Sequence, residues 1–277
     1  VDHPPTSLLL SLSIRMTEYA SVRVDRHPST HVAEVVLSRG PRLNTMGAQF
    51  FDDIRDVFQE LDRDDEVRVI VLRAEGKMFT AGLDLKEAAT TLLGSGDQLT
   101  RAQQGWVFYD VVKRWQGALQ QLQECRKPIV CAIHNKCIGG GVDLICAGDV
   151  RFCSKDAAFS IQEVKLGIVA DIGTLQRISK LVGKGTAREM AFSGDPLPAD
   201  RALACGLVTR VYSSVEELHK EALAFAEQCA RNSPRALHGT KIVMNYADEH
   251  STRDGLEQVA LFNSAFLETS DIQEAVM

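Results

Sequence analysis

The chain has 277 residues, of which 45% are hydrophobic and 25% charged, and its net charge at pH 7 is -6. This length can bury a large core in one domain or two, and the composition is ordinary for a globular protein. The negative charge and the lack of a long basic run exclude nucleic acid as an expected partner. No stretch is long enough to predict a membrane span.

Residues 1–19 are interpreted as a disordered extension or as the remnant of an organelle-targeting segment. Beyond them, short alternating or apolar runs predict strands, and apolar residues at helical spacing predict helices. In the first half of the chain we expect strands at 21–25, 31–37 and 67–72, helices at 46–61 and 107–122, and a mobile loop at 90–99.

Most of the candidate catalytic residues of the sequence lie in the stretch 129–175. Residues 129–133 predict a short buried strand, and the triplet Gly139-Gly140-Gly141 leads on towards a helix. A helix start without Cβ atoms leaves bare N–H groups that can hold a phosphate or a developing oxyanion. The simpler interpretation of the triplet is a tight turn with close helix packing.

Three acids in this stretch, Asp143, Glu163 and Asp171, have apolar neighbours in the sequence. Desolvation raises the pKa of a carboxyl group, which suits it to proton transfer near neutral pH. Each acid also has a structural interpretation. Asp143 can satisfy N–H groups at a helix start, and Asp171 can cap the helix that follows it. Glu163 can pair with Lys165 or with another base on the surface.

A second passage of small residues, 76–85, follows the predicted strand at 67–72. One N–H group of this passage could pair with one from the glycine triplet, and two donors that converge on one oxygen form an oxyanion hole. Asp84 in this passage is interpreted as a structural cap. His134 is interpreted as a satisfied core histidine and not as a catalyst.

The chain carries seven cysteines, several of them inside apolar runs. Their odd number and their neighbours favour reduced, mostly buried thiols in a reducing compartment. No pair has the spacing and the histidine partners of a zinc site, so we expect no metal.

After the central stretch the pattern changes from mixed to helical. Short strands are expected at 150–152, 157–159 and 207–211, and helices at 175–181, 187–192, 198–205, 215–232, 234–246 and 252–267. We therefore divide the chain into a strand–helix body at 20–213 and a helical region at 214–277.

Two segments carry a resemblance to a known family. They are Met78-Phe79-Thr80-Ala81-Gly82-Leu83-Asp84-Leu85 and Ile138-Gly139-Gly140-Gly141-Val142-Asp143-Leu144. In order and separation they resemble the enoyl-CoA hydratase/isomerase (crotonase) superfamily, over roughly residues 20–270. With acids in register at 143, 163 and 171, the chain is most similar to the Δ3,5-Δ2,4-dienoyl-CoA isomerases of that superfamily.

The resemblance implies an α/β fold, a crotonase-like spiral of strand–strand–helix units with a C-terminal helical region for oligomerisation. It implies discs of three subunits, commonly paired into hexamers. It implies an acyl-CoA thioester as substrate, with coenzyme A as part of that substrate and no separate cofactor, and a mitochondrial or peroxisomal location. Nothing in the sequence selects among Lys77, Lys86 and Lys241 as contacts for the CoA phosphates.

The resemblance also assigns roles to residues. The N–H groups of Leu83 and Gly140 would form the oxyanion hole for the thioester oxygen. Asp171 would remove a C2 proton, Glu163 would deliver a proton to C6, and Asp143 would tune or orient them from the pocket floor. The residues that would line the acyl-CoA site are Ala81, Gly82, Leu83, Asp84, Leu85, Gly140 and Gly141.

The enoyl-CoA hydratases of this superfamily carry glutamates at the places of Asp143 and Glu163, and ordinarily no acid at the place of Asp171. The shorter first acid and the added third acid therefore favour an isomerase. Enoyl-CoA hydratase stays an alternative, and a non-catalytic crotonase-like scaffold is a further one. A serine protease of similar spiral fold is set aside, because no Ser/His/Asp group has plausible spacing.

Overall fold

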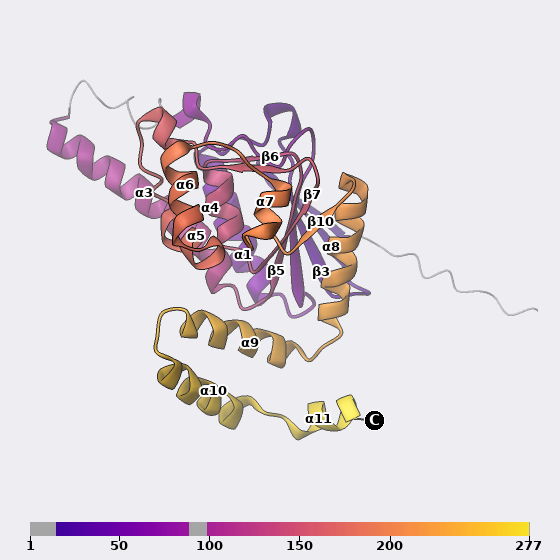
Figure 1. Cartoon of the computed structure of the whole chain (residues 1–277). Coiled ribbons are helices and arrows are strands. Elements are labelled where there is room, and N and C mark those ends of the chain that lie inside the picture. Colours follow the sequence, from indigo (N-terminus) through magenta and orange to yellow (C-terminus); the bar gives the residue numbers. More distant parts are fainter. Residues whose placement is uncertain (1–14, 89–98, 277) are drawn as a thin grey trace, which may run out of the picture.

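The computed structural model describes residues 15–88 and 99–276. The extension predicted before residue 15, and the loop predicted at 90–99 apart from Leu99, lie outside this part of the chain. Figure 1 shows a strand–helix body, with helices on both faces of a sheet, and further helices beneath it. The α/β class and the C-terminal helical region predicted from the sequence are confirmed.

The main sheet has seven strands in the order β1-β2-β3-β4-β5-β7-β10. The strands are β1 (Arg15–Glu18), β2 (Val22–His27), β3 (Val32–Leu37), β4 (Val69–Ala74), β5 (Ile129–Ile133), β7 (Val150–Ser154) and β10 (Arg210–Tyr212). The pairs β1–β2 and β2–β3 are antiparallel, and the strands from β3 to β10 run parallel to one another. Strand β1 lies within residues 1–19, so the interpretation of that segment as a disordered extension or targeting remnant was wrong for Arg15–Glu18, which pairs with β2.

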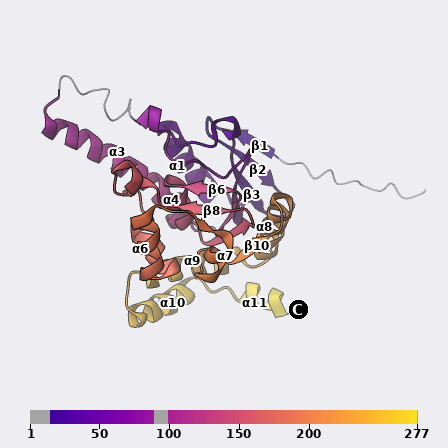
Figure 2. The same ribbon diagram turned by 45° about the horizontal axis from the view of Figure 1, so that its top comes forward.

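A second sheet of three strands, in the order β6-β8-β9, lies beside the first (Figure 2). Its strands are β6 (Lys136–Ile138), β8 (Ala158–Ser160) and β9 (Leu197–Pro198). The sequence predicted β8 one residue early and did not predict β6 or β9, because two or three residues are too few to show alternation.

The helices agree broadly with the periodicity of the sequence. They are α1 (Ala48–Arg63), α3 (Arg101–Glu124), α4 (Gly140–Cys146), α5 (Thr174–Val182), α6 (Lys184–Ser193), α7 (Ala199–Ala204), α8 (Val215–Ala230), α9 (Pro234–Ala247), α10 (Thr252–Phe266) and α11 (Thr269–Val276). Two 3-10 turns, η1 (Gly40–Arg42) and η2 (Glu163–Leu166), complete the described elements.

Several predicted boundaries differ from the structure, and two of the differences have a clear physical cause. Helix α3 starts at Arg101 and not at residue 107, because a capping box between Thr100 and Gln103 satisfies its first N–H groups. Its first turns extend away from the body in both views. The strand predicted at 207–211 is β10 at Arg210–Tyr212, since Leu207 and Val208 are buried in a loop instead.

The face of the main sheet that α1 covers, called the inner face here, carries the larger core. Alternate residues of β3, Ala33, Val35 and Leu37, point to this face, as expected for a strand. They are covered by the apolar stripe of α1, which comprises Phe50, Phe51, Ile54, Val57, Phe58 and Leu61. Phe51 stacks on Trp115 of α3 at 4.6 Å between ring centroids, which joins the two helices. Each such buried side chain contributes roughly 2 kcal/mol.

The outer face of the sheet is covered in part by α8. The residues that α8 buries recur every four positions, at Leu218, Ala222, Ala226 and Ala230. Three of them are alanine, which lets the helix lie close to Val32, Val69 and Val71 of the sheet. All seven cysteines are free, and five of them are buried, as predicted.

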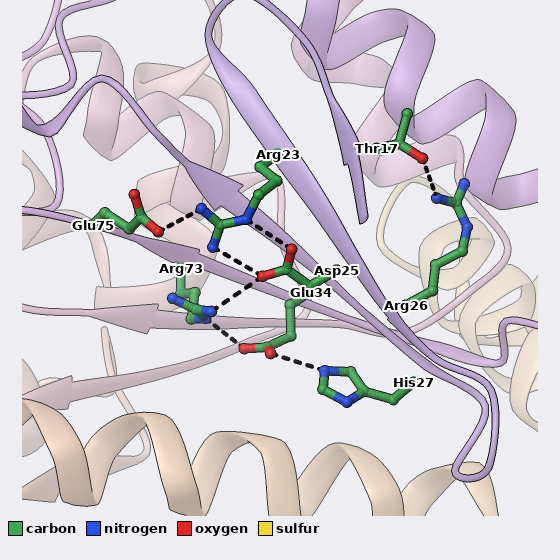
Figure 3. Close-up of polar contacts among 8 residues, drawn as sticks. All are labelled: Thr17, Arg23, Asp25, Arg26, His27, Glu34, Arg73 and Glu75. Carbon is green, nitrogen blue, oxygen red and sulfur yellow. Dashed lines mark hydrogen bonds and ion pairs between the residues drawn. The ribbon is translucent and has the colours of Figure 1, made fainter. Parts of the chain in front are cut away.

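The rest of the outer face is occupied by a network of charges on β2, β3 and β4 (Figure 3). Arg73 contacts both Asp25, at 3.5 Å, and Glu34. The other oxygen of Glu34 lies 2.9 Å from Nε2 of His27. Asp25 in turn accepts a 2.7 Å bond from Arg23. These side chains share one face because strand residues two apart point the same way.

The network changes the pKa of its members. Burial acts to raise the pKa of Glu34, but the His27 bond and the Arg73 charge outweigh it and lower the pKa to about 2. The Glu34 bond raises the pKa of His27, against the opposing effect of burial. The Glu34 contribution to stability is therefore present above its ordinary pKa of 4.5 and is lost as the pH falls towards 2.

Lysine 241 ties α9 to the body. Its buried ammonium lies 2.7 Å from Asp149 and donates to the carbonyl groups of Leu122 and Lys127. Among the described helices, none combines the length and the hydropathy needed to cross a membrane.

Replacement of Glu34 tests the charge network. Glu34→Gln should lower the free energy of unfolding at pH 6 by roughly 3 kcal/mol, because Arg73 and His27 lose a buried partner. The deficit should shrink as the pH falls from 4.5 towards 2, where the wild type also loses the charge. Urea unfolding followed by tryptophan fluorescence at several pH values measures this. Glu75→Gln, at the exposed partner of Arg23, should have little effect. A loss of unfolding free energy that does not change with pH would contradict the lowered pKa of Glu34.

Candidate active site

The passage 80–84 lies against β6, and the approach depends on Gly82. Thr80 donates its N–H to Lys136 O at 3.1 Å and accepts from Ile138 N–H at 3.2 Å. Gly82 has φ +84°, and a Cβ on it would lie 2.7 Å from Ile138 O. No other residue type can occupy this position without displacing the main chain. The two segments of the sequence resemblance are therefore neighbours in space.

Two backbone N–H groups near this contact have no acceptor. Met46 bonds the carbonyl of Gly82 and the N–H of Asp84, both at 2.9 Å, so the N–H of Leu83 between them points away from Met46. Gly140 is the first residue of α4, where an N–H has no acceptor within the helix. Within residues 15–88 and 99–276, no hydrogen bond is made by either N–H group.

Asp143 lies on α4 with its side chain fully buried. Its Oδ1 accepts from the N–H of Thr174, the first residue of α5, so it caps a neighbouring helix and not its own. Its Oδ2 is buried and has no hydrogen-bond partner in the described chain. Burial raises the pKa of Asp143 to about 6, and the bond with Thr174 opposes the rise.

Glu163 begins the turn η2 and is half-buried beside the glycine triplet. A Cβ on Gly139 would lie 3.1 Å from its Oε1. The alternative pairing with Lys165 is wrong, because Lys165 bonds Asp195 at 2.8 Å. Its Oε2 is buried without a partner among the described residues. Burial, and then the charges of Asp143 and Asp171, raise the pKa of Glu163 to about 7.

Asp171 is half-buried in the segment between η2 and α5. Its neighbour Ile172 packs on the glycine triplet, since a Cβ on Gly140 would lie 3.6 Å from Ile172 Cδ1. The alternative role of Asp171 as a cap is wrong, because the N-cap of α5 is Gly173 and Asp143 takes the first N–H. Burial raises the pKa of Asp171.

Asp84 has the structural role that we expected. His134 lies in the core as expected, but it is not satisfied, because its buried Nδ1 has no hydrogen-bond partner among the described residues. Asp84 accepts from Glu87 N–H at 3.2 Å and from Thr45 Oγ1 at 3.1 Å, and the first of these bonds is the main cause of its lowered pKa. His134 is 3% exposed, and its Nε2 lies 3.1 Å from Gly76 O.

The remaining predicted lining residues differ in exposure. Ala81 donates its N–H to Leu43 O, and Leu85 is exposed. Gly141 is packed against Thr80, whose Cγ2 would lie 2.3 Å from a Cβ at that position. Lys241 is held by its ion pair with Asp149, so it is not placed to meet a phosphate.

The three acids come from α4, η2 and the segment before α5, and they are close enough for their charges to affect one another. Glu163 and Ile172, the neighbour of Asp171, both lie against the glycine triplet that carries the unpaired N–H of Gly140. A cavity of about 1090 Å³ lies elsewhere, between the body and α9–α11, and none of the three acids lines it. The arrangement can bind an oxygen with N–H donors and exchange protons through carboxyl groups with raised pKa values.

Comparison with known proteins gives a consistent result. The model of the enoyl-CoA hydratase/isomerase family matches residues 28–277. A mitochondrial Delta(3,5)-Delta(2,4)-dienoyl-CoA isomerase of Dictyostelium discoideum is 42% identical over 98% of this chain and 91% of its own length. A peroxisomal protein of the same name from Arabidopsis thaliana is 38% identical over 94% of both chains. A crystal structure of enoyl-CoA hydratase from Bacillus anthracis superposes with a TM-score of 0.80 at 25% identity, over 95% of this chain and 94% of its own.

The raised pKa of Glu163 predicts a cost in stability. From pH 4.5 to about 7 the folded protein keeps a proton that the unfolded chain has lost, so stability falls as the pH rises. Glu163→Gln should therefore be more stable than the wild type at pH 8, by roughly 2–3 kcal/mol, and the difference should shrink below pH 5. Chemical denaturation at fixed protein concentration measures it. Glu124→Gln, at an exposed position, is the control, and equal profiles for the two variants would refute the predicted cost.

Proposed function

This chain belongs to the enoyl-CoA hydratase/isomerase family, and we propose that it is an isomerase that converts 3,5-dienoyl-CoA into 2,4-dienoyl-CoA in the oxidation of unsaturated fatty acids. The observation that carries the proposal is the third acid, Asp171, beside Glu163 and Asp143. Two relatives that cover nearly the whole chain carry the name of this isomerase.

The first step is loss of a proton from C2 of the thioester. The N–H groups of Leu83 and Gly140 donate hydrogen bonds to the thioester oxygen as it gains negative charge, and one such donor is worth on the order of 3 kcal/mol. Asp171, ionised at the start, takes the C2 proton. The electron pair then delocalises over the conjugated carbons as far as C6.

The second step is delivery of a proton to C6. Glu163 starts protonated and gives its proton to C6, which leaves the double bonds at C2 and C4. Because its pKa is raised to about 7, Glu163 can hold this proton near neutral pH. Asp143 keeps the pKa of Glu163 high through its charge.

The assembly and the compartment are parts of the same proposal. Large apolar side chains are exposed on α10 and α11, among them Leu256, Leu261, Phe266 and Ile272, and they support a homo-oligomer, a trimer or a hexamer of two trimers. The relatives are named mitochondrial and peroxisomal, which supports the mitochondrial matrix or the peroxisome.

The direct test is the ultraviolet spectrum of the protein incubated with 3,5-octadienoyl-CoA. The proposal expects the absorbance of a conjugated 2,4-dienoyl thioester to appear. Crotonyl-CoA, the substrate for a hydratase assay, should turn over far more slowly. Rapid hydration of crotonyl-CoA with no diene shift would instead assign the chain to the hydratases.

Asp171→Asn tests the base. The variant should lower kcat for the diene shift by at least about 10²-fold, because an amide cannot accept the C2 proton. Stopped-flow absorbance of the conjugated product measures the rate. Asp195→Asn, which changes an exposed acid bonded to Lys165, serves as the control and should keep wild-type turnover. Near-normal turnover of Asp171→Asn would exclude Asp171 as the base.

The pH profile of kcat/KM tests the acid. The rate should fall above pH 7, as Glu163 loses the proton that it must deliver, and should also fall at low pH as Asp171 becomes protonated. In Asp143→Asn the basic limb should move to lower pH, because the charge that raises the Glu163 pKa is gone while an oxygen remains for Thr174 N–H. A basic limb that stays in place would contradict the role of Asp143.

A further inference from the structure

The segment that carries Asp171 makes few hydrogen bonds of its own. It lies between η2 and α5, with the buried side chains of Ala170 and Ile172 on either side of the acid. Among the described residues, only one hydrogen bond joins another residue to the main chain of residues 169–172. Gln116 of α3 donates it, from Nε2 to the carbonyl oxygen of Asp171 at 2.6 Å.

Both the oxygen and the nitrogen of the Gln116 side-chain amide are hydrogen-bonded, which fixes its orientation. Its Oε1 accepts from Nζ of Lys113 at 3.0 Å, one helical turn earlier on α3. This bond leaves Nε2 directed at Asp171, 55 residues further along the chain. The donor can therefore select one position of the Asp171 main chain.

A second contact with α3 holds the end of the same segment. The guanidinium of Arg177 lies over Gly173, where a Cβ would come within 1.8 Å of Nη1. Two further glutamines hold that guanidinium, Gln120 at 2.6 Å and Gln123 at 2.9 Å. Gln116, Gln120 and Gln123 are spaced by four and three residues, so they share one face of α3.

Helix α3 is itself held in place by packing against the main core. Ala118, Leu119 and Leu122 are buried in the main core, and Trp115 stacks on Phe51 of α1. The glutamine face of α3 is therefore held by packing on one side and reaches the acid-bearing segment on the other.

We propose that Gln116 positions Asp171 for proton removal from C2. Gln120 and Gln123 assist it, because they hold Arg177 over Gly173 at the end of the same segment. Gln116 is a positioning residue, because it acts through the main chain of Asp171. The inference rests on the proposed function for the role of Asp171. A base that is misplaced by about 1 Å can lose on the order of 10²-fold in rate with little change in substrate binding.

Gln116→Met tests the inference, because methionine keeps the length of the side chain and removes the donor. Gln121→Met is the matched control, since Gln121 lies on the same helix and accepts a 3.1 Å bond from Gln59 of α1. Gln116→Met should lower kcat for 3,5-octadienoyl-CoA about 10–100-fold and leave KM within about threefold. Gln121→Met should stay within about twofold in both.

Hydrogen–deuterium exchange of the bonded N–H groups of Ile168 and Thr174, at the two ends of the segment, reports local opening of the segment and does not need turnover. It should be about tenfold faster in Gln116→Met than in the wild type, and unchanged in Gln121→Met. Gln116→Glu, which also lacks the donor, is measured in the same way if Gln116→Met does not fold. Equal exchange and equal kcat in the two methionine variants would overturn the inference. A wild type that does not shift the diene would refute the proposed function, and the exchange comparison would still decide the role of Gln116.

Discussion

The proposed site depends on buried carboxyl groups that form no ion pair with the described residues. Asp143 and Glu163 each hold one oxygen away from water with no hydrogen bond from the described residues, and burial is the main cause of their raised pKa values. Such groups cost stability in their charged form. The fold tolerates the cost because large apolar cores on both faces of the main sheet offset it.

One bond organises the acids in space. Thr174 N–H donates to Asp143, so the start of α5 lies against α4 and brings the segment of Asp171 to the glycine triplet. The two interpretations of Asp143, as a helix cap and as a part of the site, are therefore not exclusive. Its Oδ1 satisfies a helix start, and its Oδ2 and its charge remain to act on Glu163.

The sequence predicted what periodicity and composition control. The stripe of α1 was visible because Phe50, Ile54 and Phe58 recur every four residues, and the glycine triplet correctly marked the start of α4. The closeness of Lys165 in the sequence suggested a wrong partner for Glu163, because Lys165 bonds Asp195 instead. The contact of Gln116 with Asp171 joins residues 55 positions apart through one side chain, and such a contact leaves no pattern in a single sequence. The roles of the three acids and of the two N–H groups stay predictions.

The central claim is that two different carboxyl groups remove and deliver the proton at opposite ends of a conjugated chain. The most direct measurement is the isomerisation of 3,5-octadienoyl-CoA in D₂O, with the position of deuterium in the product read by NMR. The account predicts deuterium at C6, delivered by a Glu163 that has exchanged with solvent. A product that carries the original C2 proton at C6 would show that one group moves it along the chain, and would contradict the account.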